Sequence, residues 1–73
     1  MDAQTNGIAI KAFIENIVER LDQAAGIARA AQACAHAGNV AKAVEIALDV
    51  EQLLYEANTL LDAASLLARI GET

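Results

Sequence analysis

A leucine heptad runs through residues 50–70, which read VEQLLYEANTLLDAASLLARI. Leu53, Leu60 and Leu67 stand seven residues apart, with alanine or leucine in the neighbouring columns. A seven-residue apolar repeat is typical of a helix that is buried along its length against other helices. The heptad therefore predicts how this segment packs and indicates nothing about a substrate.

The apolar periodicity of this segment begins near residue 40, and an earlier periodic stretch occupies the first half of the chain. Between them, Gly38 suits a left-handed helix end and Asn39 suits the N-cap of the next helix. Thr5 or Asn6 is the expected cap of the first helix, and no proline interrupts either stretch. We therefore expect one all-α domain over residues 1–73, an antiparallel helical hairpin with helices at about 6–37 and 40–70 and a turn at 38–39.

Alternating steps of three and four residues give the columns along which the two helices would pack. In the second helix these columns hold Ala43, Ile46, Val50, Leu53, Ala57, Leu60, Ala64 and Leu67. In the first helix the same steps select Ile10, Ile14, Ile17, Leu21, Ala24, Ala28, Ala31 and Ala35. Folding the chain at Gly38 places Ile10 opposite Leu67 and Ile17 opposite Leu60. Most layers then pair a large residue with a smaller one, as dense packing requires.

One hairpin leaves apolar side chains beside these columns without a packing partner: Phe13, Val18, Ala25, Ile27, Cys34, Leu54 and Leu61. A 73-residue chain with one cysteine has no intrachain disulfide to stabilise its small core, so oligomerisation is the expected remedy. Two hairpins docked face to face form a four-helix bundle. Burial of the unpartnered side chains would contribute on the order of 10 kcal/mol per subunit before entropy costs. The predicted homodimer interface comprises Phe13, Ile17, Val18, Leu21, Ile27, Leu53, Leu54, Leu60 and Leu61.

Composition narrows the function. The chain is 56% hydrophobic, and this high apolar content excludes a disordered chain. Its net charge is −5. Its five basic residues are scattered, so neither nucleic acid nor an anionic membrane is an expected partner. No apolar run approaches the roughly 18 residues of a membrane span. The N-terminus lacks the basic region of a secretory signal, and we therefore expect a cytoplasmic protein.

Two acidic clusters favour an alternative. Glu15, Glu19 and Asp22 lie along the first helix, and Glu45, Asp49 and Glu56 along the second. Carboxylates on facing bundle helices bind divalent metals, which would make the chain a metal-dependent enzyme or a ligand-binding bundle. The first cluster falls on the solvent side of its helix, so a solvated acidic face is the favoured interpretation. We expect no catalytic, cofactor-binding or metal-binding residues.

Cys34 and His36 form the one combination of thiol and imidazole. Residues two apart on a helix do not face each other, so they are not expected to act as a catalytic pair. Cys34 is interpreted as a small buried apolar residue. His36 is interpreted as a solvent-facing residue of the last helical turn, where a cation suits the helix dipole.

Leu48 and Tyr55 occupy outward positions of the second helix, where polar residues are the rule. They are either ordinary exposed apolar residues or a strip that binds a partner.

The short hairpin with small and large residues alternating in its columns, as in Ala57, Leu60, Ala64 and Leu67, resembles the plasmid repressor-of-primer proteins. That resemblance implies a dimeric four-helix bundle and, as a further alternative, RNA binding. RNA binding would require Lys11, Arg20 and Arg29 to gather on one face of the dimer, and the chain shares no RNA-contacting motif. The sequence as a whole favours a small non-enzymatic module, adaptor or regulatory, that binds itself or another helical protein.

Overall fold

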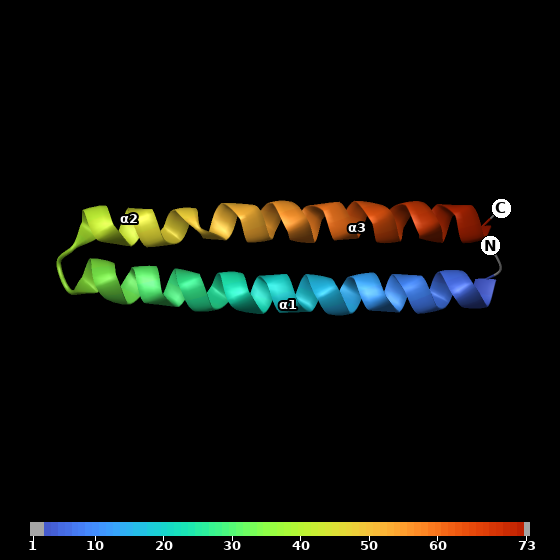
Figure 1. Cartoon of the computed structure of the whole chain (residues 1–73), viewed down its shortest axis with the longest axis horizontal. Coiled ribbons are helices and arrows are strands. Elements are labelled where there is room, and N and C mark those ends of the chain that lie inside the picture. Colours follow the sequence, from blue (N-terminus) through green and yellow to red (C-terminus); the bar gives the residue numbers. More distant parts are fainter. Residues whose placement is uncertain (1–2, 73) are drawn as a thin grey trace.

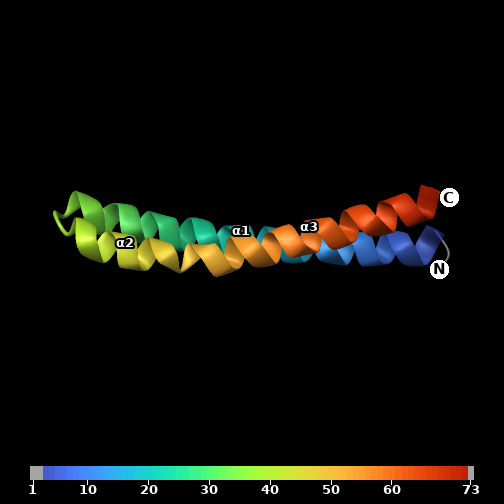
Figure 2. The ribbon, with the colours of Figure 1, turned by 90° about the horizontal axis from the view of Figure 1, so that it is seen from above.

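A computed structural model describes residues 3–72, which form the two arms of one helical hairpin (Figure 1). The first arm is α1 (Ala3–His36), and the second is α2 (Val40–Leu48) followed end to end by α3 (Val50–Glu72). The molecule is a rod with principal extents of 54 × 14 × 12 Å. Figure 2 shows the two arms crossing at a shallow angle, as helices in a coiled coil do. The predicted all-α hairpin is thus confirmed.

The turn follows the prediction closely. Gly38 has a φ of +96°, a left-handed conformation that glycine adopts without a steric penalty. The Gly38 N–H donates to the Ala35 carbonyl at 3.0 Å, and the Asn39 N–H donates to the Cys34 carbonyl at 3.1 Å. This pair of bonds is a Schellman motif, which satisfies the last carbonyls of α1. The Asn39 side chain then accepts the Lys42 N–H at 3.1 Å and caps α2, as predicted.

The start of α1 differs from the prediction. The helix begins at Ala3, so Thr5 and Asn6 lie inside it and the predicted N-cap position is wrong. Asn6 is only 3% exposed, and its Nδ2 donates to the Leu67 carbonyl at 3.1 Å on the other arm. A Cβ built at Gly71 would lie 3.3 Å from the same Nδ2, so Asn6 packs where α3 carries no side chain. These contacts set Asn6 level with Gly71 and agree with the predicted register of Ile10 opposite Leu67.

The second arm is interrupted at Asp49, where we expected an unbroken helix. The Asp49 N–H donates to the Ile46 carbonyl three residues back, at 3.1 Å, which tightens one turn. Its φ of −65° and ψ of −15° remain in the right-handed helical region. The arm therefore continues in the same direction through this point (Figure 1), and the heptad keeps its phase from α2 to α3.

The seam, meaning the columns by which the arms pack on each other, matches the prediction in the second arm. Ala43, Ala57 and Ala64 are buried, and the larger members of the predicted columns are half-buried: Ile46, Val50, Leu53, Leu60 and Leu67.

In α1 the predicted seam is half wrong. The column of Ile10, Ile17, Ala24 and Ala31 is correct, but Ile14, Leu21 and Ala28 are exposed. The structure instead uses the column on the other side, which holds Asn6, Phe13, Arg20, Ile27 and Cys34. Steps of three and four residues from the central column lead to an apolar column on either side of it. The predicted column, which contains Ile14, is therefore wrong, and the column of Phe13 packs on the second arm. In the observed register Phe13 falls level with Ala64 and Arg20 with Ala57, so the bulky residues of this column face small ones.

The resulting core is thin. The buried apolar residues of the described range are all alanines, each 6–7% exposed: Ala24, Ala31, Ala43, Ala57 and Ala64. The larger seam residues keep part of their surface in water. No helix in the described range is long and apolar enough to span a membrane. The hairpin therefore brings its two arms close together while leaving much apolar surface outside.

Candidate functional site: the apolar flank

The hairpin has two long flanks, one on each side of the seam. A helical turn takes 3.6 residues, so a step of four residues overshoots a full turn and a step of three falls short of it. The two steps therefore lead to opposite sides of the column from which they start. Since the arms run antiparallel, the same step along either chain segment leads to the same side of the hairpin. Ile14 follows Ile10 by four residues, and Leu61 follows Ala57 by four. These two residues therefore belong to one flank.

This side, which we term the apolar flank, is formed by both arms, and its columns next to the seam hold no charged residue in the described range. Its outer columns hold Val18, Ala25 and Val44 and, in line with them, Lys11, Glu51 and Asn58. Its members are Ile14, Val18, Leu21, Ala25 and Ala28 of α1, Val40, Val44 and Ala47 of α2, and Leu54, Leu61 and Ala68 of α3. The large members are about half exposed or more, with Leu54 at 50% and Leu61 at 56%. An apolar surface with a polar edge is typical of a protein–protein contact.

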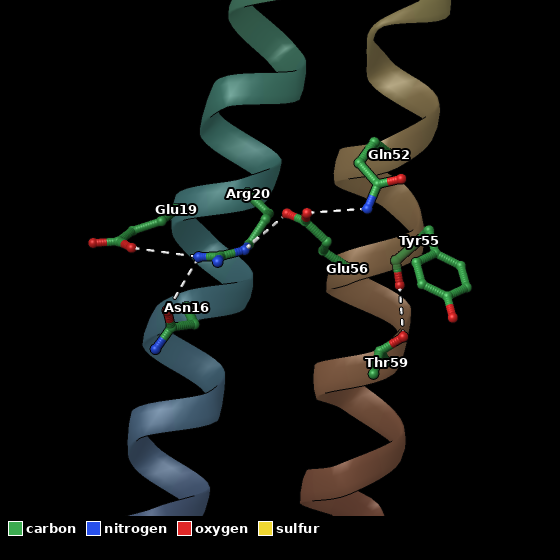
Figure 3. A network of polar contacts seen from close by, with 7 residues as sticks. All are labelled: Asn16, Glu19, Arg20, Gln52, Tyr55, Glu56 and Thr59. Carbon is green, nitrogen blue, oxygen red and sulfur yellow. Dashed lines mark hydrogen bonds and ion pairs between the residues drawn. The ribbon is translucent and has the colours of Figure 1, made fainter.

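The opposite side, the polar flank, is occupied by contacts within the chain (Figure 3). The Arg20 guanidinium leaves α1 toward α3, where its Nε lies 3.4 Å from Glu56 Oε1. Its Nη1 donates to Asn16 Oδ1 at 3.1 Å and lies 3.7 Å from Glu19 Oε2. Gln52 Nε2 donates to Glu56 Oε2 at 3.1 Å and holds that carboxylate from the other direction.

A shallow groove accompanies this network and is lined by Arg20, Tyr55, Glu56, Thr59 and Leu60. Three of the polar side chains that line it are already engaged within the chain: the Thr59 hydroxyl donates to the Tyr55 carbonyl at 3.0 Å, and Arg20 is paired with Glu56. The groove is therefore a gap between ordered side chains on the surface of the hairpin.

The structure divides the predicted interface residues between two locations. Val18, Leu21, Leu54 and Leu61 lie on the apolar flank and are exposed. The other five are half-buried in the seam: Phe13, Ile17, Ile27, Leu53 and Leu60. Those seam residues contact the other arm first, so they would reach a second chain only with their outer edges. The interface itself stays a prediction.

Leu48 and Tyr55, the predicted partner strip, lie seven residues apart on the outer edge of the second arm. Their exposed fractions are 54% and 68%. In Figure 3 the Tyr55 ring points away from α1, on the far side of α3. The two residues therefore lie apart from the apolar flank, and their role in binding stays a prediction.

The residues that might bind a metal do not come together. In the described range, no three His, Cys, Asp or Glu side chains are grouped so that they could hold a metal ion. Glu19 and Glu56 approach the same place only through Arg20, whose positive charge takes the position that a cation would need. Cys34 is half-buried, with its Sγ 3.5 Å from the Asn39 carbonyl, as expected for a seam residue. His36 is exposed in the last turn of α1, as predicted.

Sequence reasoning missed two parts of this arrangement. Ile14 belongs to the apolar flank and not to the predicted seam, and Arg20, expected only as one of the bases that RNA binding would require, occupies the seam. A signal for both was present in the chain. Glu19, Arg20 and Glu56 are complementary charges that the predicted register already brought to one level.

No protein-family model, curated protein or solved structure matches this chain. Function is therefore inferred from the chemistry of the two flanks.

Proposed function

We propose that this chain is a small, non-enzymatic protein–protein interaction module, adaptor or regulatory, that pairs with a second copy of itself into a four-helix bundle. The surface that pairs is the apolar flank. One observation carries the proposal: exposed apolar columns run along both arms beside a core whose buried apolar residues are alanines. Apolar faces of helical hairpins are buried in this way when two hairpins dock.

The solvent-accessible area of a single chain supports pairing with a second copy. A compact monomer of this mass is expected to expose about 4,300 Å². This 7.6 kDa chain exposes 5201 Å². The excess of about 900 Å² is close to the roughly 800 Å² that each partner contributes to a standard interface. A second copy would therefore cover what the single hairpin leaves in water.

The energy points the same way. Completing the burial of a half-exposed leucine, isoleucine or valine contributes about 1 kcal/mol. Ile14, Val18, Leu21, Leu54 and Leu61 together would contribute on the order of 5 kcal/mol per chain before the entropy of association is subtracted. No equal gain is available to the polar flank, because exposed ion pairs contribute at most about 1 kcal/mol each.

Sedimentation velocity at micromolar concentration tests the proposal. The unmodified chain should sediment as a dimer, and Leu61→Glu should sediment as a monomer because it places a charge in the centre of the apolar flank. Leu66→Glu is the matched control. Leu66 is a leucine of the same helix with nearly the same exposed fraction, 53% against 56%, but it lies on the side of the polar flank.

The control variant should remain a dimer. A well-folded monomer at every concentration up to 100-fold above the starting one would refute the proposal. Equal dissociation by both variants would show that the pairing surface is not the apolar flank.

A further inference from the structure

We propose that the two copies pair with their turns at opposite ends of the bundle, so that α1 packs on α1 of the partner copy and the second arm packs on its counterpart. This orientation rests on the proposed self-association. A two-fold axis of this kind crosses the rod at mid-length. Each flank residue then meets the residue that lies equally far from that point on the other copy.

The middle of α1 falls between Glu19 and Arg20. In the register that Asn6 sets with Leu67 and Gly71, this level corresponds to residues 57–58 of the second arm. An axis at mid-length, where two rods of equal length overlap in full, therefore crosses the second arm at this level.

Four flank residues of the second arm are symmetric about that level, whereas Val40 and Val44 near the turn lie outside the symmetric set. The axis brings Leu54 onto Leu61 of the partner copy, and Ala47 onto Ala68 of the partner copy. The leucines therefore pack together at the centre, and the alanines pack together toward both ends. Such layers keep the spacing of the two helices even on the two sides of the axis.

Four of the five flank residues of α1 fit the same axis, while Ala28 comes level with Lys11 of the partner copy. Val18 comes level with Leu21 of the partner copy, and Ile14 comes level with Ala25 of the partner copy. A large residue faces a small one in the outer layer, and two medium-to-large residues meet near the axis. Both arms thus place the two-fold axis at one point of the rod.

The other orientation, with both turns at the same end, fits less well. It would lay α1 on the second arm of the partner copy at the same level. Ile14 and Leu21 would then meet Leu61 and Leu54 in one half, while alanine met alanine in the other half, so that the helices would have to splay. It would also set Val18 and Ala25 against Asn58 and Glu51, which leaves apolar side chains facing polar ones.

Spin labels near the turn distinguish the two orientations by pulsed dipolar spectroscopy. The label would be attached to His36→Cys in a chain that also carries Cys34→Ala, because His36 is exposed and lies beside the turn. Opposite turns separate the two labels by about 50 Å along the bundle, at 1.5 Å of rise per residue. Adjacent turns hold them within roughly 30 Å, the width of the bundle with its labels.

Lys42→Cys in the same background repeats the measurement on the second arm, with about 46 Å expected along the axis. It supplies the answer if the first variant does not fold as judged by circular dichroism. Long distances at either site support the proposed orientation. Distances below roughly 30 Å overturn the orientation and leave the dimer intact. An absent dipolar signal from a sample that sediments as a monomer would instead refute the proposed self-association.

Discussion

The two flanks of the hairpin are made by the same helices and differ in the columns that stand just outside the seam. On the polar flank, Asn16 and Glu56 occupy these columns, and Arg20 joins them across the two arms. On the apolar flank, Leu21 and Leu61 take the corresponding columns and remain about half exposed. One side is completed by contacts within the chain. The other side carries apolar surface that the chain by itself does not cover, and this is where a function is to be sought.

Truncating the apolar flank should have the largest effect. Leu54→Ala together with Leu61→Ala removes two side chains from the centre of the proposed interface, where each buried leucine lost costs about 2 to 5 kcal/mol. We expect the free energy of unfolding to fall by about 3 kcal/mol per chain or more, measured by urea denaturation at several protein concentrations. Glu56→Ala on the polar flank is the comparison, with an expected loss of about 1 kcal/mol or less. Similar losses on both flanks would remove the distinction between them.

Phe13 and Ile14 are neighbours in the sequence, but Phe13 lies in the seam and Ile14 lies on the apolar flank. Phe13→Ala should lower the free energy of unfolding by about 2 kcal/mol, because its half-buried ring packs inside the hairpin, and should leave the dimer dissociation constant nearly unchanged. Ile14→Ala should raise the dimer dissociation constant about thirtyfold, since about 1 kcal/mol of interface burial is lost in each of the two chains. Combined denaturation and sedimentation measurements separate the two effects. If Ile14→Ala lowered mainly the free energy of unfolding and Phe13→Ala weakened mainly the dimer, Ile14 would belong to the seam as the sequence predicted.

Substitutions of Arg20 test whether its charge or its packing stabilises the polar flank. Arg20→Glu places a carboxylate beside Glu19 and Glu56, and we expect about 1 kcal/mol of destabilisation that shrinks in high salt. Arg20→Leu should be neutral or slightly stabilising, because an apolar residue suits a seam position opposite Ala57. Thermal denaturation at low and high ionic strength checks both variants. A loss with leucine as large as that with glutamate would mean that packing of the arginine side chain, and not its charge, is the important contribution.

The smallest effect is expected on the outer edge of the second arm. Tyr55→Ala should change the free energy of unfolding and the dimer dissociation constant within about 0.5 kcal/mol, since the ring is 68% exposed and points away from α1. Circular dichroism and sedimentation at one concentration suffice as the measurement. A large shift would extend the interaction surface from the apolar flank to the edge formed by Leu48 and Tyr55.

The sequence predicted the elements that depend on local chemistry. Gly38 and Asn39 end one helix and begin the next through their own backbone and side-chain preferences, and both were correctly placed. The second-arm seam was also correct, because the leucine heptad and the alanine column beside it leave one choice of phase. The register followed from the position of the turn.

The remaining features depend on tertiary contacts. In α1, the columns of Ile14 and of Phe13 are both apolar enough to pack, and only the facing arm decides between them. Asn6 was expected to cap a helix that begins three residues earlier than predicted, and its burial against Gly71 arises from a contact between the two ends of the chain. The tightened turn at Asp49 has no counterpart in the apolar pattern, since that pattern keeps its phase through it.

Together with the proposed pairing, an alanine core would make the folded population depend on the concentration of the chain. Unfolding a hairpin that buries few large side chains exposes little additional apolar surface, so its heat-capacity change is small and its thermal transition broad. Pairing adds a term governed by mass action, and the apparent melting temperature then rises with chain concentration. A dilute sample and a concentrated one should therefore melt at different temperatures, and the slope of that dependence reports the dimer dissociation constant.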